Sequence, residues 1–550
     1  MVLGVLLVNL AIGAKVYSES DANSSANDPH ANLDLFVNVL ERIRRDYVDG
    51  GELTYEDLVH GALRGMIGML DPHSEFMPPT RYSHLMDDTE GRFGGVGVHI
   101  NIQDGYLTVL APMEDTPAYE AGIMSGDRIV KIEGKNARNI SMPEAVDKLR
   151  GKPGSKVKMT FFRPSTREDI EVTLKRALIK VATVKDINNQ RKFTVDENKI
   201  GYVRLTQFGE ATSRDLEEAL RKLELEDMKG LVLDLRHNGG GILQEAIKLT
   251  GLFIEEGPVV QVRDYRGRRR VMSDTDSRIT YNGPLIVAVS HMSASASEIV
   301  AAALQDHGRA IVVGGKMTHG KGTVQQIMPL NRAFIANLNK DSGQLKFTIS
   351  KFYRINGATT QRDGVKPDIV LPSVLDYLGM SEAELPRALE SDEIDKAEYK
   401  PLNRVEAFFT SLRKASTKRI NGDQDYKYIK EDIVRAKKQK EDRSISLNEK
   451  ERRKERAVTK SRIEARNKER AKRGARSEKY FEIDVKIAGA NKPLKNLNTP
   501  KPRKENPDPN AIPEDDSGTF RFDPELRETL QILSDFVKLN SKLISQIERN

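Results

Sequence analysis

The residues best suited to chemistry form two short motifs, a serine-rich segment and a glycine-flanked lysine about two dozen residues later. The first is Ser293-Ala-Ser-Ala-Ser-Glu298, which follows an apolar run at 285–289, and the second is Gly320-Lys-Gly322. The apolar run predicts a buried strand, and residues 293–305 predict a helix. The first N–H groups of a helix have no internal partner and can hold a developing oxyanion. A serine at this junction is therefore a candidate nucleophile.

A nucleophilic serine needs a base, and the neighbourhood offers a lysine and several histidines. Lys321 lies between two glycines, and a desolvated lysine releases its proton more easily and can act as a general base. The rivals for a Ser-His arrangement are the nearby histidines, His291, His307 and His319. Each serine of the segment is also a good helix cap or small packing residue, so spacing does not select one of them.

Composition limits the classes of function. The chain has 550 residues, enough for several domains, and a net charge of +7 whose excess lies between about residues 413 and 476. That stretch interleaves glutamates with its basic residues and has almost no aromatics, which favours a solvated helical surface over a nucleic-acid site. There is no cysteine, which excludes disulfides and thiol chemistry. No metal-binding motif occurs, so we expect neither a metal nor another cofactor.

The N-terminus predicts export. Residues 2–14 are an apolar run followed by a polar segment, the proportions of a signal-peptide core and not of a full membrane span. No Lys or Arg precedes the run, which departs from the usual signal pattern. We expect residues 1–27 to be a signal peptide or an inner-membrane anchor with a linker, and the protein to be periplasmic.

The two ends of the remaining chain have helical patterns. Residues 28–89 are expected to form a small helical region, with apolar residues from Leu33 to Ile43 at helical spacing and Thr54 opening a second helix. Residues 386–550 predict a basic helical extension, in which 430–475 could form one long helix or be partly disordered and 496–516 is a linker. Asp523 and Pro524 predict a final helix whose apolar stripe docks on another part of the protein.

Residues 90–176 combine short strands with glycine turns. The motifs GGVGV, PAYEAGI and GDRIVKIEG follow one another in an order that resembles a bacterial protease-associated PDZ domain. Glycine-flanked N–H groups can cradle a carboxylate, and an edge strand can accept a peptide as an added strand beside helix 141–150. The residues expected to bind a peptide C-terminus are Gly95, Val96, Gly97, Val98, Ala145 and Leu149.

Residues 177–385 alternate strand and helix patterns, which predicts an α/β core with functional residues at the carboxyl ends of its strands. The segment Asp234-Leu-Arg-His-Asn-Gly-Gly-Gly241 and the serine segment both fall at such ends and could face one cleft. The glycine loop lacks the spacing of a phosphate-binding or dinucleotide-binding loop. Its glycines better suit an oxyanion donor, because they allow close backbone approach.

Together, the PDZ-like unit, DLRHNGGG, SASASEI, GRAIVVGG, GKGTVQ and GVKPDIVLP resemble the carboxyl-terminal processing (tail-specific, Prc-type) serine proteases from about Leu33 to Val374. The resemblance implies an α/β (ClpP/crotonase-like) core with a Ser-Lys dyad. It places the nucleophile at Ser295, the base at Lys321, a lysine-orienting glutamine at Gln325 and a supporting aspartate at Asp306. It places the oxyanion donors at the N–H groups of Gly241 and Ala296.

One departure concerns the segment before Lys321. Gly314 to Gly320 is one residue longer than the usual family segment, which keeps Lys316 and His319 as minor rivals to Lys321. The resulting expectation is a secreted endopeptidase that binds the apolar C-terminal tail of a protein substrate, with room for an adaptor protein and an oligomer. The alternative is a catalytically inactive PDZ scaffold. Nucleic-acid binding by the basic extension is a third, disfavoured hypothesis.

Overall fold

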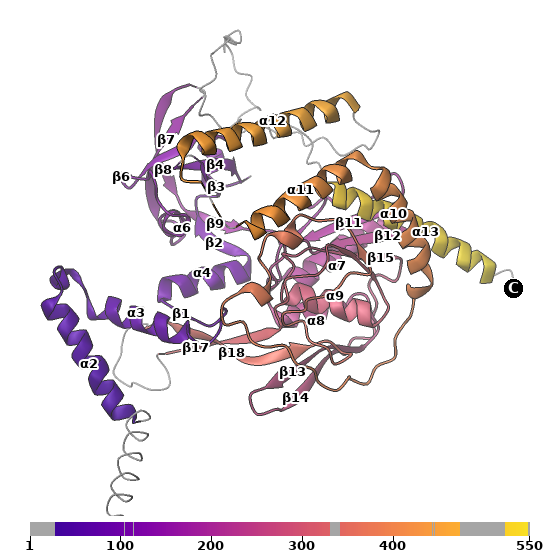
Figure 1. The fold of residues 1–550 in the computed structure, drawn as a ribbon, viewed down its shortest axis with the longest axis horizontal. Coiled ribbons are helices and arrows are strands. Elements are labelled where there is room, and N and C mark those ends of the chain that lie inside the picture. The colour runs from indigo at the N-terminus through magenta and orange to yellow at the C-terminus, as the bar shows by residue number, and fades with distance from the viewer. Residues whose placement is uncertain are drawn as a thin grey trace, which may run out of the picture. The chain divides into compact units, whose positions relative to one another are not determined.

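The computed structural model describes residues 28–330 apart from Asp104, Glu114 and Ser165, residues 342–473 apart from Arg443 and Ile445, and residues 523–547. The expected signal segment and the expected linker at 496–516 lie outside these residues. The chain forms two compact units, one of Met1–Thr80 with Gln325–Thr348 and one of Arg81–Val324 with Ile349–Asn550. Figure 1 shows the ribbon, coloured along the chain.

The first unit contains two of the predicted helices and part of a sheet. Its elements are α2 (Pro29–Asp46), η1 (Gly50–Glu52), α3 (Tyr55–Ile67) and β1 (Glu75–Met77). Thr54 and Asp57 form a reciprocal capping box at the start of α3, which confirms the predicted helix entrance. Strand β1 pairs antiparallel with the start of β18 (Gln344–Tyr353), and β17 (Thr323–Pro329) also pairs with β18.

The PDZ-like part of the second unit has two antiparallel sheets, one of them only β2 and β9, and two helices. Its elements are β2 (Arg92–Gly95), β3 (Val98–Gln103), β4 (Tyr106–Pro112), α5 (Pro117–Glu120), β5 (Arg128–Ile132), β6 (Lys135–Asn136), α6 (Met142–Leu149), β7 (Lys156–Arg163), β8 (Glu168–Lys175) and β9 (Ala177–Lys180), preceded by α4 (Pro79–Glu90). The main sheet has the order β3-β4-β5-β7-β8, so β3 is an edge strand. Leu107, Ile129 and Phe161 lie in a core that is closed to water.

A six-stranded sheet forms the centre of the second unit, in the order β10-β11-β12-β15-β16-β19. Its strands are β10 (Val184–Lys185), β11 (Ile200–Leu205), β12 (Gly230–Asp234), β15 (Leu285–Val289), β16 (Ile311–Gly314) and β19 (Ile369–Val370). Every pairing is parallel except β10 with β11. The strands β12 and β15 are buried along their whole length, as expected of parallel strands covered on both faces.

Alternate side chains of these strands enter two different cores. Leu231 and Leu233 pack against α7 (Thr212–Leu225), α8 (Leu243–Gly251) and α9 (Ala296–Asp306). Val232 and Ile286 pack on the opposite face against α10 (Phe409–Gly422), α11 (Gln424–Glu441) and α13 (Pro524–Ile547). The unit therefore has helices on both faces of its sheet, and α13 appears in yellow beside β12 and β15 (Figure 1).

The remaining elements complete the second unit. β13 (Gly257–Asp264) pairs antiparallel with β14 (Arg269–Asp274) and with the end of β18. The extension adds η2 (Leu375–Tyr377), η3 (Glu382–Glu384), η4 (Glu406–Phe408) and α12 (Glu449–Arg473). Within the described ranges, every helix is too short or too polar to span a bilayer.

One predicted helix start differs from the structure, and one open alternative can be compared with it. The described residues of 430–473 include the end of α11 at Glu441 and the separate helix α12, which Asn448 caps by accepting from the N–H of Lys450. Helix α9 begins at Ala296, three residues later than the predicted start at Ser293. Ser295 has φ of 57° and ψ of −113°, which is not a helical conformation.

Candidate active site

Only one serine of the segment has a backbone and an environment suited to a nucleophile. The Ser293 hydroxyl donates to the Leu235 carbonyl at 2.8 Å, and the Ser297 hydroxyl donates to the Asn238 carbonyl at 2.9 Å. Both of these serines are fully buried, whereas Ser295 is half-buried. Ser295 also has a strained positive φ directly before α9, and such strain is common at functional sites. The geometry therefore distinguishes Ser295 from its two neighbours.

Glu298 joins the serine segment to the lysine motif. Its carboxylate oxygen Oε2 accepts from the N–H of Ser295 at 2.7 Å and from the N–H of Lys321 at 3.0 Å. The other oxygen accepts from the Gly320 N–H at 2.8 Å and the Thr318 hydroxyl at 2.6 Å. Full burial raises the pKa of Glu298 to about 7, although these four donors favour the ionised form. The two motifs thus meet on one buried carboxyl group.

The backbone of Lys321 is fixed on both sides. Its carbonyl accepts from the Thr360 hydroxyl at 3.2 Å, and the next N–H, that of Gly322, donates to the side chain of Gln361 at 2.8 Å. Gly320 has φ of 97°, and a Cβ at Gly322 would lie 2.6 Å from the Gln361 nitrogen. Glycines flank the lysine because larger residues would not fit this path. Lys321 itself is half-buried.

The glycine loop after β12 lies against the serine segment. The N–H of Ala294 donates to the Asn238 carbonyl at 3.0 Å, and a Cβ at Gly240 would lie 2.8 Å from the Cβ of Ser295. The Gly240 N–H donates to Asn238 Oδ1 at 2.9 Å, so it is engaged within the loop. Gly241 follows at φ of 148°, and Ala296 supplies the first N–H of α9. The predicted meeting of the two strand ends is therefore observed.

Two further predicted site residues, Asp306 and Gln325, have side-chain partners of their own. Asp306 is at the opposite end of α9 from Ser295, where it pairs with Arg354 at 2.5 Å and accepts from Asn356. It is not brought to the Ser295–Lys321 group, so any support it gives acts through the helix and its packing. Gln325 lies on β17 in the first unit, where its side chain donates to the Thr348 hydroxyl at 3.1 Å. Its predicted role in orienting the lysine stays a prediction.

The rival bases occupy different positions. His307 caps the C-terminal end of α9, and its Nε2 contacts the Pro258 carbonyl at 2.9 Å. The exposed Lys316 has its Nζ 4.5 Å from the ring centre of Tyr377. His319 donates its backbone N–H to the Ser293 carbonyl, and its ring Nδ1 lies 3.8 Å from Glu382. His291 is buried. Lys321, by contrast, donates its backbone N–H to the carboxylate oxygen that also accepts from Ser295.

Comparison with known proteins gives three family matches in chain order. Residues 108–163 match the PDZ domain, residues 199–371 match peptidase family S41, and residues 375–538 match the C-terminal domain of tail specific protease. A carboxy-terminal-processing protease of Bartonella bacilliformis is 36% identical over 373 residues, which cover 67% of this chain and 81% of that protein. The chain belongs to peptidase family S41.

Other members of the family match over similar lengths. The tail-specific protease of Haemophilus influenzae is 32% identical over 414 residues, covering 73% of this chain and 58% of that protein. Among solved structures, the photosystem II D1 C-terminal processing protease is 26% identical, covers 64% of this chain and 98% of that chain, and has a TM-score of 0.36. The family matches and the curated relatives identify this chain as a serine peptidase with a PDZ domain, as the sequence motifs predicted.

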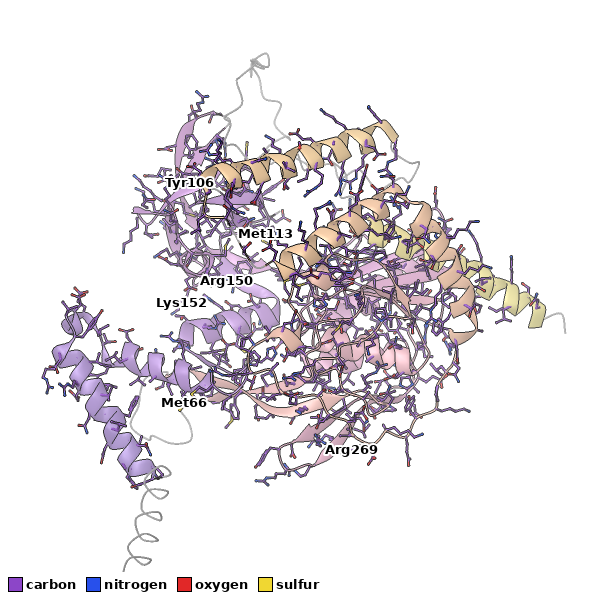
Figure 2. All side chains as sticks on the ribbon, in the orientation of Figure 1. Met66, Tyr106, Met113, Arg150, Lys152 and Arg269 are labelled. Atoms are coloured by element: carbon purple, nitrogen blue, oxygen red, sulfur yellow. The ribbon has the colours of Figure 1, made fainter. Side chains whose placement is uncertain are left out.

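The predicted tail-binding residues of the PDZ domain lie in two places, the glycine turn before β3 and the helix α6. The carbonyls of Val96 and Gly97 accept from the N–H groups of Ala118 and Met113, which fixes the glycine turn before the edge strand β3. Ala145 and Leu149 on α6 are buried in the domain core, while Val146 on the same helix is only half-buried. Arg150, labelled in Figure 2, follows α6 and stacks on Phe93 at 4.6 Å.

Sequence reasoning missed several residues of this site. The one local signal for Glu298 is a Ser-x-x-Glu capping pattern that begins at Ser295. This pattern predicts a hydrogen bond to the Ser295 N–H but not the bonds to Gly320 and Lys321. Asn238 was part of the glycine motif, yet its carbonyl and side chain organise the loop through contacts that no local pattern reveals. In the described part of the chain, no group of three or more His, Asp or Glu is arranged to hold a metal ion.

Proposed function

We propose that this S41 peptidase is an exported endopeptidase that uses Ser295 as its nucleophile and Lys321 as its general base. The observation that carries the proposal is the shared Glu298 carboxylate, because one oxygen atom binds the backbone of both residues. The commitment of the Ser293 and Ser297 hydroxyls to backbone carbonyls supports the choice of Ser295. Neither a histidine base nor a metal is required.

The chemistry follows from these positions. The Ser295 hydroxyl attacks the scissile carbonyl carbon while the unprotonated Lys321 amine accepts its proton. The N–H groups of Gly241 and Ala296 stabilise the oxyanion of the tetrahedral intermediate. Collapse breaks the C–N bond, and Lys321 donates the proton to the leaving amine. Water, deprotonated by Lys321, then attacks the acyl carbon, the ester bond to Ser295 breaks, and Lys321 returns the proton to the Ser295 oxygen.

The PDZ domain supplies substrate selection in this proposal. Its strand β3 is an edge strand whose carboxyl-terminal half is exposed, so an extended peptide can add to it by backbone hydrogen bonding. The glycine turn at residues 95–97 then faces the end of the peptide, where N–H groups can bind a terminal carboxylate. The substrates are proteins with apolar C-terminal tails. The apolar segment at 2–14 supports a periplasmic location, with that segment either cleaved or retained as an anchor.

Cleavage of an unfolded protein with an apolar tail tests the dyad. Ser295→Ala and Lys321→Ala should each abolish cleavage and leave tail binding unchanged, because neither removes a PDZ contact. Lys316→Ala is the matched control, since it removes a neighbouring exposed lysine and should keep turnover within about threefold of the original chain. Full activity of Lys321→Ala would overturn the dyad. Tail binding without cleavage by the original chain would instead indicate an inactive scaffold.

A further inference from the structure

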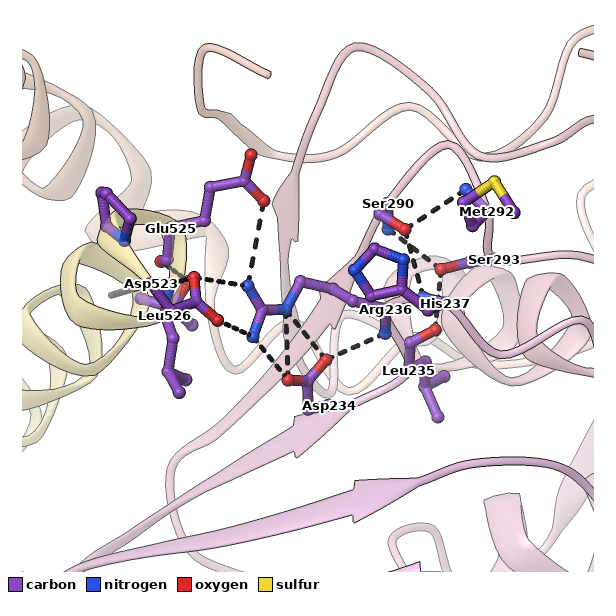
Figure 3. A network of polar contacts seen from close by, with 12 residues as sticks. Asp234, Leu235, Arg236, His237, Ser290, Met292, Ser293, Asp523, Glu525 and Leu526 are labelled. Carbon is purple, nitrogen blue, oxygen red and sulfur yellow. Dashed lines mark hydrogen bonds and ion pairs between the residues drawn. The ribbon is translucent and has the colours of Figure 1, made fainter. Parts of the chain in front are cut away.

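A network of ion pairs connects the final helix of the chain to the glycine loop of the candidate active site (Figure 3). Its centre is Arg236, which lies two residues after the end of β12 and whose side chain is 9% exposed. The guanidinium donates from Nε and Nη2 to Asp234, with Nη2 at 2.8 Å. It also donates from Nη1 and Nη2 to the two carboxylate oxygens of Asp523, at 3.0 and 2.8 Å. These two aspartates lie 289 positions apart in the sequence.

The two aspartates serve different edges of the guanidinium. Asp234 is buried and also accepts from the Tyr202 hydroxyl at 2.7 Å, so the inner edge of Arg236 is held within the sheet. The outer nitrogen, Nη1, has its partners on the C-terminal segment, Asp523 at 3.0 Å and Glu525 at 3.8 Å. Bidentate pairing of a planar guanidinium with a carboxylate fixes orientation as well as position. Asp523 therefore restricts how the Arg236 side chain can tilt.

Asp523 is itself held by the fold of the C-terminal helix. Its Oδ1 accepts from the Leu526 N–H at 2.9 Å, which caps α13. Leu526, Ile532 and Leu533 of that helix are buried against the central sheet. The carboxylate is consequently presented to Arg236 by a docked helix and not by a free tail.

On its other side, the backbone around Arg236 contacts the serine segment. The Leu235 carbonyl accepts from the Ser293 hydroxyl at 2.8 Å, and the His237 N–H donates to the Ser290 hydroxyl at 3.2 Å. Two residues later the Asn238 carbonyl accepts from Ala294 and Ser297. A rotation of the backbone at Arg236 would therefore move the loop that approaches Ser295.

We propose that Asp523 is a positioning residue of this peptidase, which acts through Arg236 to hold loop 235–241 in its catalytic conformation. The C-terminal helix then acts on the catalytic centre indirectly, through Arg236. The inference rests on the proposed function, because loop 235–241 carries the proposed oxyanion donor Gly241. Asp523 is 37% exposed, so its ion pair adds little to global stability, and the expected effect is on loop geometry.

Asp523→Asn in the full-length chain separates positioning from folding. Asparagine caps a helix as well as aspartate does, but it cannot accept two N–H bonds from Arg236 as a carboxylate does. We expect kcat to fall about 10- to 100-fold with KM nearly unchanged, because small displacements of catalytic groups have effects of this size. Glu528→Gln is the matched control, since it removes another α13 ion pair, that with Arg419, which does not contact the loop. It should leave kcat within about threefold.

Amide hydrogen exchange gives a second readout that does not depend on activity. In Asp523→Asn, the amides of residues 235–241 should exchange at least about tenfold faster than in the original chain, and in Glu528→Gln they should not. Unchanged kcat together with unchanged exchange in Asp523→Asn would overturn the inference, as would equal losses in the two variants. If the original chain shows no Ser295-dependent cleavage, the proposed function fails, and the exchange measurement alone decides the positioning role.

Discussion

At the scale of single residues, Glu298 combines full burial with four hydrogen-bond donors. Burial in a medium of low polarity disfavours its charged form, and the pKa of Glu298 is raised from 4.5 to about 7. Because the folded protein then holds a proton that the unfolded chain has released, stability falls as pH rises from about 4.5 to about 7. The contribution of Glu298 to the free energy of unfolding is therefore largest in acidic solution, below about pH 4.5.

This fall in stability with rising pH can be measured by comparison with Glu298→Gln, whose side chain does not titrate. Between pH 4.5 and 7, the original chain should lose about 3 kcal/mol of unfolding free energy relative to the variant. Denaturant unfolding at several pH values checks it. A difference that stays constant over this range would contradict the raised pKa.

At the scale of elements, the glycine loop after β12 depends on the absence of side chains at one position. Gly240 has φ of 99°, and an added Cβ would lie 2.8 Å from both the Ala294 carbonyl oxygen and the Ser295 Cβ. Gly240→Ala should lower kcat by at least about tenfold, because it displaces the loop from Ser295. Steady-state cleavage of a tail-bearing substrate measures this.

The same loop supplies a control for that prediction. A Cβ at Gly239 would meet no atom within 4 Å, and its φ lies outside the left-handed region. Gly239→Ala should therefore keep kcat within about threefold, because it adds a methyl group to open space. Equal losses at Gly239 and Gly240 would show that loop flexibility, and not the contact with Ser295, sets the rate.

At the scale of the whole molecule, the C-terminal helix closes one face of the central sheet. Leu533 is fully buried and packs against Gly230 on β12, where an added Cβ would lie 3.1 Å from Leu533. Leu533→Ala should lower the free energy of unfolding by about 2–5 kcal/mol, because it removes buried methyl groups and leaves a cavity. Leu543→Ala on the same helix should change it by less than about 0.5 kcal/mol, since Leu543 is 41% exposed.

Thermal or denaturant unfolding of the full-length chain distinguishes these two variants. A small loss for Leu533→Ala would mean that α13 docks weakly and that residues 523–547 form a separable tail. A large loss would show that these residues fold with the peptidase domain, as the shared core of α13, β12 and β15 indicates.

Local patterns were sufficient for many elements. Thr54 with Asp57 and Asp523 with Pro524 placed helix entrances, because capping involves only neighbouring residues. The pattern was less informative at 430–475, where the charged composition suits a helix throughout. The start of α12 at Glu449 depends on the side chain of Asn448, which competes for backbone N–H groups.

The sequence by itself determined the family, the order of its domains and the motifs of the candidate site, because these depend on residue type and spacing along the chain. Only the tertiary structure showed that Ser293 and Ser297 are committed to backbone carbonyls and that Glu298 binds both Ser295 and Lys321. It also brought Asp523 to Arg236. Such contacts join positions far apart in sequence, and the folding of the sheet and its helices decides which of them form.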